Sequence, residues 1–292
     1  MSAVAEARRR LGDVLLSRVA GPEAHTARRR IHGEPGPRWF GPEDPIQRVH
    51  GDASMYVGGL RALLLQSLHP LAMAAVAQHS DYRSDPWGRL ARTSTFIAET
   101  TYARTEDAER AIAVVRAVHR YVSGTTTDGR PYRADDPHLL TWVHVAEIDS
   151  FLTAHQIFGR RPLDEADIDA YVAQTAGVAR RLGGERVPTT HAELRETLER
   201  YRPELEQTPE ALEAAEFLLH RPPITGAARC GYALIGRAAV ATLPPWAREP
   251  LRLDGRRSVT GGRLAGHVAT RSLRWALGGI DPVDTPTPDS PH

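Results

Sequence analysis

The sequence has little cysteine, no excess of either charge and no long uninterrupted apolar run. Its 292 residues include a single cysteine, Cys230, which excludes an intrachain disulfide framework and every metal centre built from several cysteines. The 37 basic and 36 acidic residues nearly cancel, and no block of lysine or arginine is dense enough to predict nucleic acid or an anionic membrane as a partner. These absences exclude several function classes without selecting one.

The longest apolar stretch, residues 60–77, is too interrupted to span a membrane. The residues that interrupt it are Arg61, Gln66, Ser67, His69 and Pro70. We therefore expect a buried helix that bends at Pro70, and no membrane span. Near the N-terminus, Asp13 and Arg18 break the apolar stretch that a secretory signal requires, so a cytoplasmic location is expected.

Apolar residues recur at helical spacing along most of the chain, whereas strand-type alternation is scarce. The sequence therefore predicts an all-α fold, a single globular domain of many helices. We expect these helices at about residues 3–19, 52–78, 86–100, 106–123, 137–158, 164–182, 190–202, 208–219, 226–241 and 244–251. The expected division is a helix and Pro/Gly-rich lead-in at 1–44, a main domain at 45–252 and an extension at 253–292, with a disordered tail after Gly279.

A histidine interrupts the apolar face of the helix expected at 106–123, between an N-cap at Thr105 and a stop at Gly124. The residues of this face are Ala108, Ile112, Val115, Val118 and Val122. His119 falls on the same face, one turn after Val115. An imidazole that faces a core needs a carboxylate, a backbone carbonyl or a metal, because burying an unpaired polar group costs about 1–3 kcal/mol. A histidine paired within the core and a metal ligand both remain open.

His69 also lies among apolar residues, directly before Pro70. The proline ring frees the carbonyl of residue 66, so the imidazole of His69 either satisfies this broken turn or lines a pocket. Both interpretations remain open.

Two later segments place polar side chains on helical faces. Arg89 and Thr93 lie one turn apart on one face of the helix expected at 86–100, and Arg92 lies beside them, where a solvent-exposed arginine is the simpler interpretation. His144 and Glu147 flank one turn of the helix expected at 137–158. Such a pair can be purely structural, because each side chain satisfies the other.

Two kinds of iron site can use such residues in a helical protein. A di-iron site requires two Glu-x-x-His motifs and two more inward-facing glutamates, whereas this chain has one pair in reverse order, and Glu99 and Glu109 have no matching partners. Non-covalent haem requires one imidazole on an apolar helix face and a large apolar slot, which His119 and the Leu/Ala/Val-rich helices permit. Cys230 is an alternative thiolate ligand, although a lone cysteine in a helix is more often inert packing.

Three segments carry a resemblance to a known family, in this order: LLLQSLHPLAMAAVAQHSDYRSDPWGRLARTSTF, VVRAVHRYVSG and DGRPYRADDPHLLTWVHVAEIDSFL. They resemble the catalytic domain shared by the oxygenase MpaB and the latex-clearing rubber oxygenases, over roughly residues 45–250. The resemblance implies an all-helical domain around a b-type haem held by one histidine. It also implies that the protein uses O₂ to cleave or oxidise hydrophobic substrates.

The resemblance assigns roles residue by residue. It implies that His119 is the proximal ligand of the haem iron and that His144 is a supporting residue near the haem edge. The family's Arg-x-x-Lys-Thr segment matches Arg89, Arg92 and Thr93, so an arginine stands where the rubber-cleaving members have lysine. Because arginine stays protonated, it cannot ligate iron as a neutral lysine does. We therefore expect neither a lysine-capped state nor cleavage of polyisoprene.

The expected function is that of a haem b-dependent oxygenase that uses O₂ or peroxide on a hydrophobic small molecule. Arg89 would pair with a haem propionate or hydrogen-bond the oxidant, Thr93 would donate to the oxidant, and Arg92 and His69 complete the expected catalytic group. An electron donor is a further candidate partner. The alternatives are a haem-binding or apolar-ligand-binding sensor or carrier without turnover, and a structural bundle whose histidines pair with carboxylates.

Overall fold

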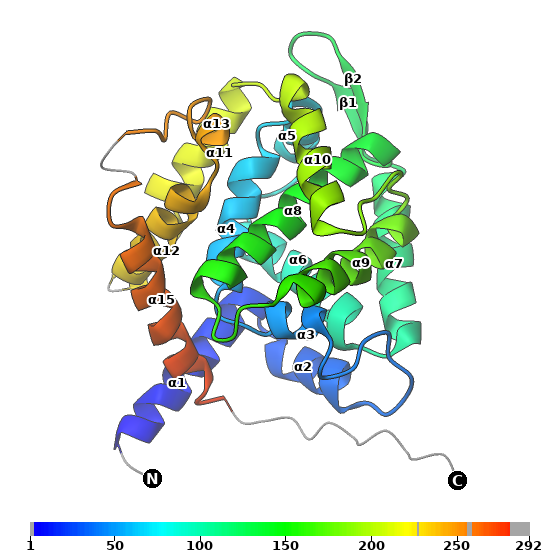
Figure 1. Cartoon of the computed structure of the whole chain (residues 1–292). Helices are drawn as coiled ribbons and strands as arrows, with labels where there is room; N and C mark the ends of the chain where they lie inside the picture. The colour runs from blue at the N-terminus through cyan, green and yellow to red at the C-terminus, as the bar shows by residue number, and fades with distance from the viewer. Residues whose placement is uncertain (1–2, 227, 256–258, 281–292) are drawn as a thin grey trace.

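Helices form nearly all of the regular structure in the computed structural model, which describes residues 3–226, 228–255 and 259–280 (Figure 1). The helices are α1 (Ala3–Ala20), α2 (Ala24–Gly33), α3 (Pro45–His50), α4 (Met55–Gln66), α5 (Pro70–His79), α6 (Pro86–Tyr102), α7 (Thr105–His119), α8 (Pro137–Phe158), α9 (Glu165–Leu182), α10 (His191–Tyr201), α11 (Pro209–His220), α12 (Ala228–Thr242), α13 (Pro245–Arg248) and α15 (Gly262–Leu277). A 3-10 helix, η1 (Arg202–Glu204), follows α10, and one antiparallel hairpin joins β1 (Ser123–Thr125) to β2 (Pro131–Arg133). The predicted all-α fold is confirmed.

The central helix, α8, begins and ends where the sequence predicts, at residues 137 and 158. The Asp136 carboxylate caps it by accepting a hydrogen bond from the His138 N–H at 2.8 Å. α4 lies along α8 (Figure 1) and approaches it closely at Gly58, where an added Cβ would lie 3.1 Å from the Phe151 Cα. Glycine at this position therefore sets the distance between the two helices that form most of the core.

The chain bends by 106° between α4 and α5. Pro70 begins α5 and cannot donate to the carbonyl of Gln66, which instead accepts hydrogen bonds from the backbone N–H of His69 and the indole N–H of Trp142, each at 3.3 Å. The broken turn is thus satisfied by the backbone and by a neighbouring helix, and not by the His69 ring. In the ranges that the structure describes, no single helix is long and apolar enough to cross a membrane; α4 and α5 together reach that length and composition only as this bent pair.

The chain leaves α7 earlier than the sequence predicts. α7 ends at His119, and Gly124, the expected stop, lies in β1 opposite Tyr132. A Cβ on Gly124 would lie 2.8 Å from the Tyr132 Cζ, so the glycine is required by this contact and not by a helix end. Thr126 accepts a hydrogen bond from the Arg130 N–H at 2.8 Å and helps to close the hairpin, which projects from the helices in Figure 1. Strands of three residues are too short for a pattern of alternation to predict them.

Three helices lie where no helix was predicted. α2 falls in the Pro/Gly-rich lead-in, α3 lies at the start of the expected main domain, and α15 falls in the C-terminal extension. α15 has no polar N-cap, because the residue before it is Gly261 with a left-handed φ of 75°. It packs on α12 through Gly262 and Gly266; a Cβ on Gly266 would lie 2.9 Å from the Ala238 Cβ. The expected disordered tail after Gly279 concerns residues 281–292, which lie outside the described part of the chain.

Candidate functional site

His119 lies at the end of α7, on a face that changes from buried to half-buried along the helix. Ile112 on this face is buried, whereas Val115 and His119 are half-buried. The expected apolar stripe is wrong at Val118, which is 55% exposed. Nδ1 of His119 is buried and has no hydrogen-bond partner among the described residues. Burial lowers the pKa of His119 against the opposing charge of Asp135, so the ring is neutral near pH 7 and keeps a free nitrogen for a ligand.

His144 and Glu147 lie one turn apart on α8. Burial and the nearby Arg180 lower the pKa of His144 to about 4, and burial raises the pKa of Glu147 to about 7. Nε2 of His144 is buried without a partner, and no hydrogen bond or ion pair joins the two side chains within the described ranges. They therefore do not satisfy each other, as a structural pair would. Titratable groups held deep in a protein without partners are typical of functional sites.

Next to Glu147, a chain of polar side chains crosses the interior. The negative charge of Glu147 helps to raise the pKa of Tyr171. The Tyr171 Oη lies 3.2 Å from Nε2 of His50, and Nδ1 of His50 lies 2.8 Å from Oγ1 of Thr101. Burial lowers the pKa of His50 to about 3, so this histidine is neutral. Sequence reasoning missed His50 and Tyr171, because 121 positions separate them and neither interrupts a periodic pattern.

The helices that carry His119 and His144 belong to two layers that do not pack closely together. α6 packs on α7 and α4 packs on α8, whereas in the described part of the chain α6 and α7 make at most sparse contacts with α4 and α8. Side chains on these helices are correspondingly accessible: Val143, in the middle of α8, is 36% exposed, and no atom lies within 4 Å of an added Cβ on Gly59 of α4. Half-buried apolar residues on the four helices include Leu63, Leu90, Val115 and Leu140. Half-buried apolar side chains therefore occur on helices of both layers.

Arg89 and its neighbours on α6 differ in their environments. Arg89 is half-buried, donates a hydrogen bond to the Ser80 Oγ at 2.5 Å, and has a pKa lowered by burial. Thr93 and Arg92 are exposed, and the Arg92 guanidinium lies 3.6 Å from the Asp85 carboxylate. Of the two arginines, Arg89 is thus the one that is half-buried, and Arg92 is exposed.

The predicted residues do not touch one another. In the ranges described, no hydrogen bond, ion pair or ring contact joins His119, His144, Arg89 or Thr93. A ligand that contacts helices of both layers would connect these side chains.

His69 lies in a separate cluster at the bend between α4 and α5. Its side chain is 3% exposed, and neither ring nitrogen has a hydrogen-bond partner among the described residues. Its Nε2 lies 3.5 Å from the carboxylate of Glu204, which His138 contacts through its own Nε2 at 2.8 Å. The rings of Trp142 and Tyr201 pack beside His69. Sequence reasoning missed His138 and Glu204, because only the fold brings three distant segments together here.

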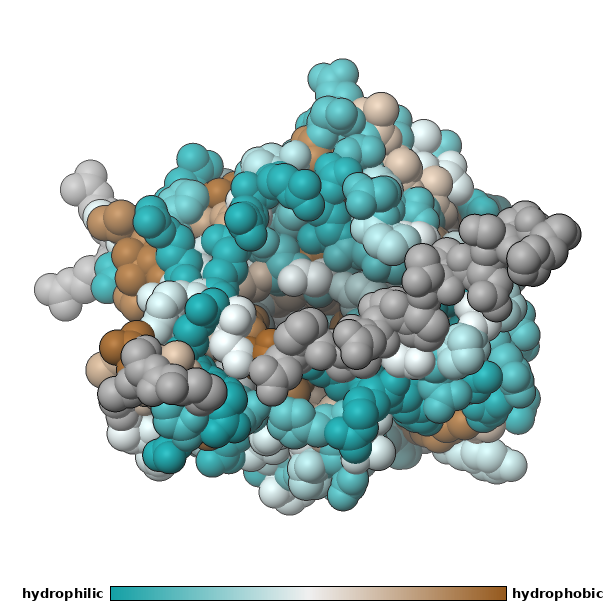
Figure 2. Space-filling view, turned by 90° about the horizontal axis from the view of Figure 1, so that it is seen from below, coloured by the Kyte–Doolittle hydropathy of each residue, from teal (hydrophilic) through white to brown (hydrophobic). Residues whose placement is uncertain are grey.

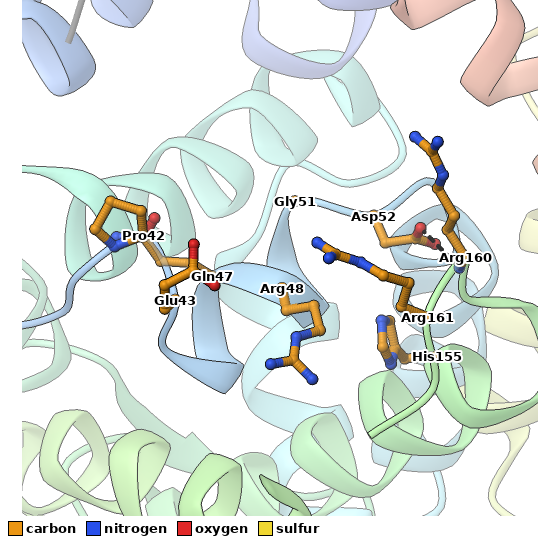
Figure 3. Close-up of a pocket in the computed structure, with 9 residues that line it drawn as sticks. All are labelled: Pro42, Glu43, Gln47, Arg48, Gly51, Asp52, His155, Arg160 and Arg161. Carbon is orange, nitrogen blue, oxygen red and sulfur yellow. Dashed lines mark hydrogen bonds between the residues drawn. The ribbon is translucent and has the colours of Figure 1, made fainter. Parts of the chain in front are cut away.

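A polar cavity of about 260 Å³ lies beside the C-terminal end of α8. Figure 3 shows the side chains of Arg48, Arg160 and Arg161 around it, with His155 close to Arg161. His155 is 1% exposed and its Nδ1 has no partner among the described residues. Asp52, on the rim, is bound by Arg274 at 2.8 Å. The cavity is too basic to suit an apolar substrate; sequence reasoning missed it.

Two alternatives from the sequence find no support in the geometry. Cys230 is exposed on α12 and therefore neither packs in the core nor faces an enclosed space. Of the glutamates considered for a di-iron site, Glu99 pairs with Arg30 at 2.5 Å and Glu109 is exposed.

On the mainly hydrophilic face seen from below, where α1, α2 and α3 lie, Figure 2 shows a central hollow with a few hydrophobic residues at its edge.

Comparison with known proteins identifies the family. The model of the family described as "ER-bound oxygenase mpaB/B'/Rubber oxygenase, catalytic domain" matches residues 47–276, from α3 to α15. The chain belongs to this oxygenase family. No curated protein and no solved structure matches it. The resemblance inferred from the three sequence segments is confirmed, and membership supports an enzyme that acts as an oxidoreductase.

Proposed function

We propose that this oxygenase-family member depends on haem b, uses O₂ or peroxide, and oxidises a hydrophobic small molecule, with His119 as the protein ligand of the iron. The observation that carries the proposal is the presence of two buried, unpaired ring nitrogens, Nδ1 of His119 and Nε2 of His144. Both lie on helices that also carry half-buried apolar side chains, Val115 on α7 and Leu140 on α8. Unpaired buried nitrogens cost free energy unless a ligand occupies them, and a large apolar cofactor with a metal ion fits this combination.

Each candidate side chain has a protonation state suited to its proposed role. When bound, haem would supply the redox-active iron at which the oxidant is activated. Burial keeps His119 neutral, as an iron ligand must be, and the half-buried guanidinium of Arg89 is suited to pair with a carboxylate such as a propionate. Thr93 offers a hydroxyl donor. Glu147, whose pKa burial raises to about 7, can hold or release a proton near neutral pH.

The proposed substrate is hydrophobic because α4, α7 and α8 each carry an accessible apolar side chain, namely Leu63, Val115 and Val143. Polyisoprene is not proposed. Arg92 stands where the rubber-cleaving members have lysine, and it is exposed and close to Asp85 instead of being directed into the protein.

The absorption spectrum of protein produced with haem supplied tests the ligand assignment. We expect a stoichiometric Soret band in the wild type that is lost or shifted in His119→Ala, because the substitution removes the iron ligand. His220→Ala is the matched control, since His220 is an exposed histidine at the end of another helix, α11, and should leave the spectrum unchanged. A colourless wild type that takes up no added haem would refute the haem proposal, and an unchanged band in His119→Ala would refute the ligand.

O₂ consumption separates an oxygenase from a sensor or carrier. The holoprotein is given a hydrophobic alkene, with and without a reductant as electron donor, and O₂ uptake is followed together with product formation. Uptake linked to product supports turnover. Haem binding without any uptake across alkene, isoprenoid and aromatic substrates would favour the non-catalytic alternative.

A further inference from the structure

Three ligand atoms gather at the ends of three different elements, away from His119. His69 directly precedes α5, His138 is the second residue of α8, and Glu204 is the last residue of η1. One donor atom from each lies within 4.8 Å of the other two. Two imidazoles and one carboxylate form a donor set that Zn²⁺ and related divalent ions accept, with a further position left for water.

The buried member of this group has no partner of its own. His69 is 3% exposed at its side chain, and both of its ring nitrogens lack hydrogen bonds among the described residues. A cation placed between Nε2 of His69 and the Glu204 carboxylate, which are 3.5 Å apart, would satisfy both groups.

His138 is oriented so that one of its ring nitrogens faces the Glu204 carboxylate. The Tyr201 hydroxyl donates to the His138 carbonyl at 2.8 Å and lies 3.3 Å from Nδ1 of His138, so its lone pairs are placed to accept an Nδ1–H. The tautomer of His138 with its proton on Nδ1 turns the lone pair of Nε2 toward the Glu204 carboxylate, 2.8 Å away. Two acceptors at this distance require a proton or a metal ion between them. A hydrogen bond to the far nitrogen is also how metal-bound histidines are commonly held.

This group is distinct from the proposed haem site. Along α8, His138 and Trp142 point to one side of the helix, and both contact the His69 cluster. His144 lies about 240° around the helix axis from His138. The argument for the cluster therefore stands whether or not His119 binds haem.

We propose that His69, His138 and Glu204 bind one divalent transition-metal ion of the Zn²⁺ type. The side chains of His138 and Glu204 are 54% and 42% exposed, which gives an ion access from solvent. Bound there, the ion ties the bend between α4 and α5 to the start of α8 and to η1.

Calorimetric titration of Zn²⁺ into chelator-treated protein tests this site. The variants are Glu204→Gln and His138→Gln, both at exposed positions that should not impair folding, and the control is Glu206→Gln. Glu206 lies two residues from Glu204 but pairs with Arg130 at 2.7 Å. We expect one Zn²⁺ per chain in the wild type and the control. Both ligand variants should bind at least about tenfold more weakly, because even removal of groups behind the ligands has this effect.

Two further readouts distinguish a coordination site from loose surface binding. Co²⁺ should give ligand-field absorption bands in the wild type and the control that Glu204→Gln lacks. Zn²⁺ should raise the thermal midpoint of the wild type and not of Glu204→Gln, because a ligand that binds only the folded state stabilises it. No stoichiometric binding by the wild type, or equal binding by Glu204→Gln, would overturn the proposal. His119→Ala should leave Zn²⁺ binding unchanged, so failure here is separate from failure of the haem assignment.

Discussion

The carboxyl group of Glu147, a half-buried residue, has no hydrogen bond or ion pair in the described ranges that compensates its charge. Nδ1 of His119 and Nε2 of His144 are buried and also lack partners there. Folded proteins pair nearly all of their buried polar atoms, so a concentration of unpaired ones indicates a place where something else binds. At this scale the sequence predicted His119, His144 and Arg89. It did not predict that ring nitrogens of His119 and His144 lack partners, because partners come from distant segments.

Replacing Glu147 by glutamine should change how stability depends on pH. The pKa of Glu147 is raised from 4.5 to about 7, so between these values the folded state keeps a proton that the unfolded chain releases. Stability is therefore full below about 4.5 and is lost as the pH rises through about 7. We expect Glu147→Gln to reduce the loss between about pH 5 and about pH 8 by on the order of 1–3 kcal/mol. Urea unfolding of haem-free protein measures it.

Exposed Glu109→Gln is the control for this experiment, because its carboxyl group is in solvent and should leave the pH dependence unchanged. An unchanged profile in Glu147→Gln would contradict the raised pKa of the buried carboxyl. His144, whose pKa is lowered to about 4, acts in the opposite direction, with stability lost as the pH falls from 6.5 through about 4. It acts in wild type and variant alike, so the comparison isolates Glu147.

Among the elements, the helices capped by an aspartate were predicted accurately, whereas the N-cap predicted at Thr105 is wrong, because Thr105 is already the first residue of α7 and Arg104 before it makes no side-chain cap hydrogen bond. Asp136 and Pro137 begin α8, and Asp164 caps α9 by accepting from the Asp167 N–H. α7 was predicted too long, because its end is decided by the hairpin that follows and not by Gly124. The start of α8 is encoded by the adjacent residues Asp136 and Pro137, and this fixes the position of His144 within the helix.

The cap of α8 should contribute measurably to stability. Asp136→Ala removes the acceptor of the His138 N–H, and we expect a loss of roughly 0.5–2 kcal/mol in the free energy of unfolding. Asp136→Asn keeps an acceptor oxygen and should lose much less. Denaturant unfolding of the two variants side by side provides the measurement, and equal losses would show that charge and not capping is responsible.

At the scale of the whole molecule, α15 closes the helical assembly against α12, α1 and α8. Arg274 of α15 reaches across to the Asp52 carboxylate at 2.8 Å, and Gly262 and Gly266 allow α12 to approach. The family match ends at residue 276, so this closure lies within the matched region. No cap or strong periodic signal in the sequence predicted α15. The role of its small residues, which is to allow close packing on α12, is visible only once the two helices are in contact.

Substitution of Gly262 by alanine should separate α15 from α12. A Cβ at this position would lie 2.6 Å from the Arg237 carbonyl oxygen, a contact that the backbone must move to relieve, and we expect a loss of about 1–3 kcal/mol. Gly231→Ala, on the exposed side of α12 with no atom within 4 Å, is the matched control. It should leave stability unchanged or raise it by up to about 1 kcal/mol. Thermal unfolding of both variants measures the difference, and similar midpoints would contradict close packing here.

The sequence by itself determined the all-α class, the ends of the helices with their own caps, and the family, because capping, periodicity and family motifs are local properties of the chain. Only the tertiary structure decided which polar groups remain unpaired and which histidines meet. His69 is the clearest case: the sequence placed it in the same catalytic group as Arg89 and Thr93, whereas its contacts are with His138 and Glu204. The physical reason is that pairing of buried groups depends on contacts between residues far apart in the chain, and no local pattern encodes them.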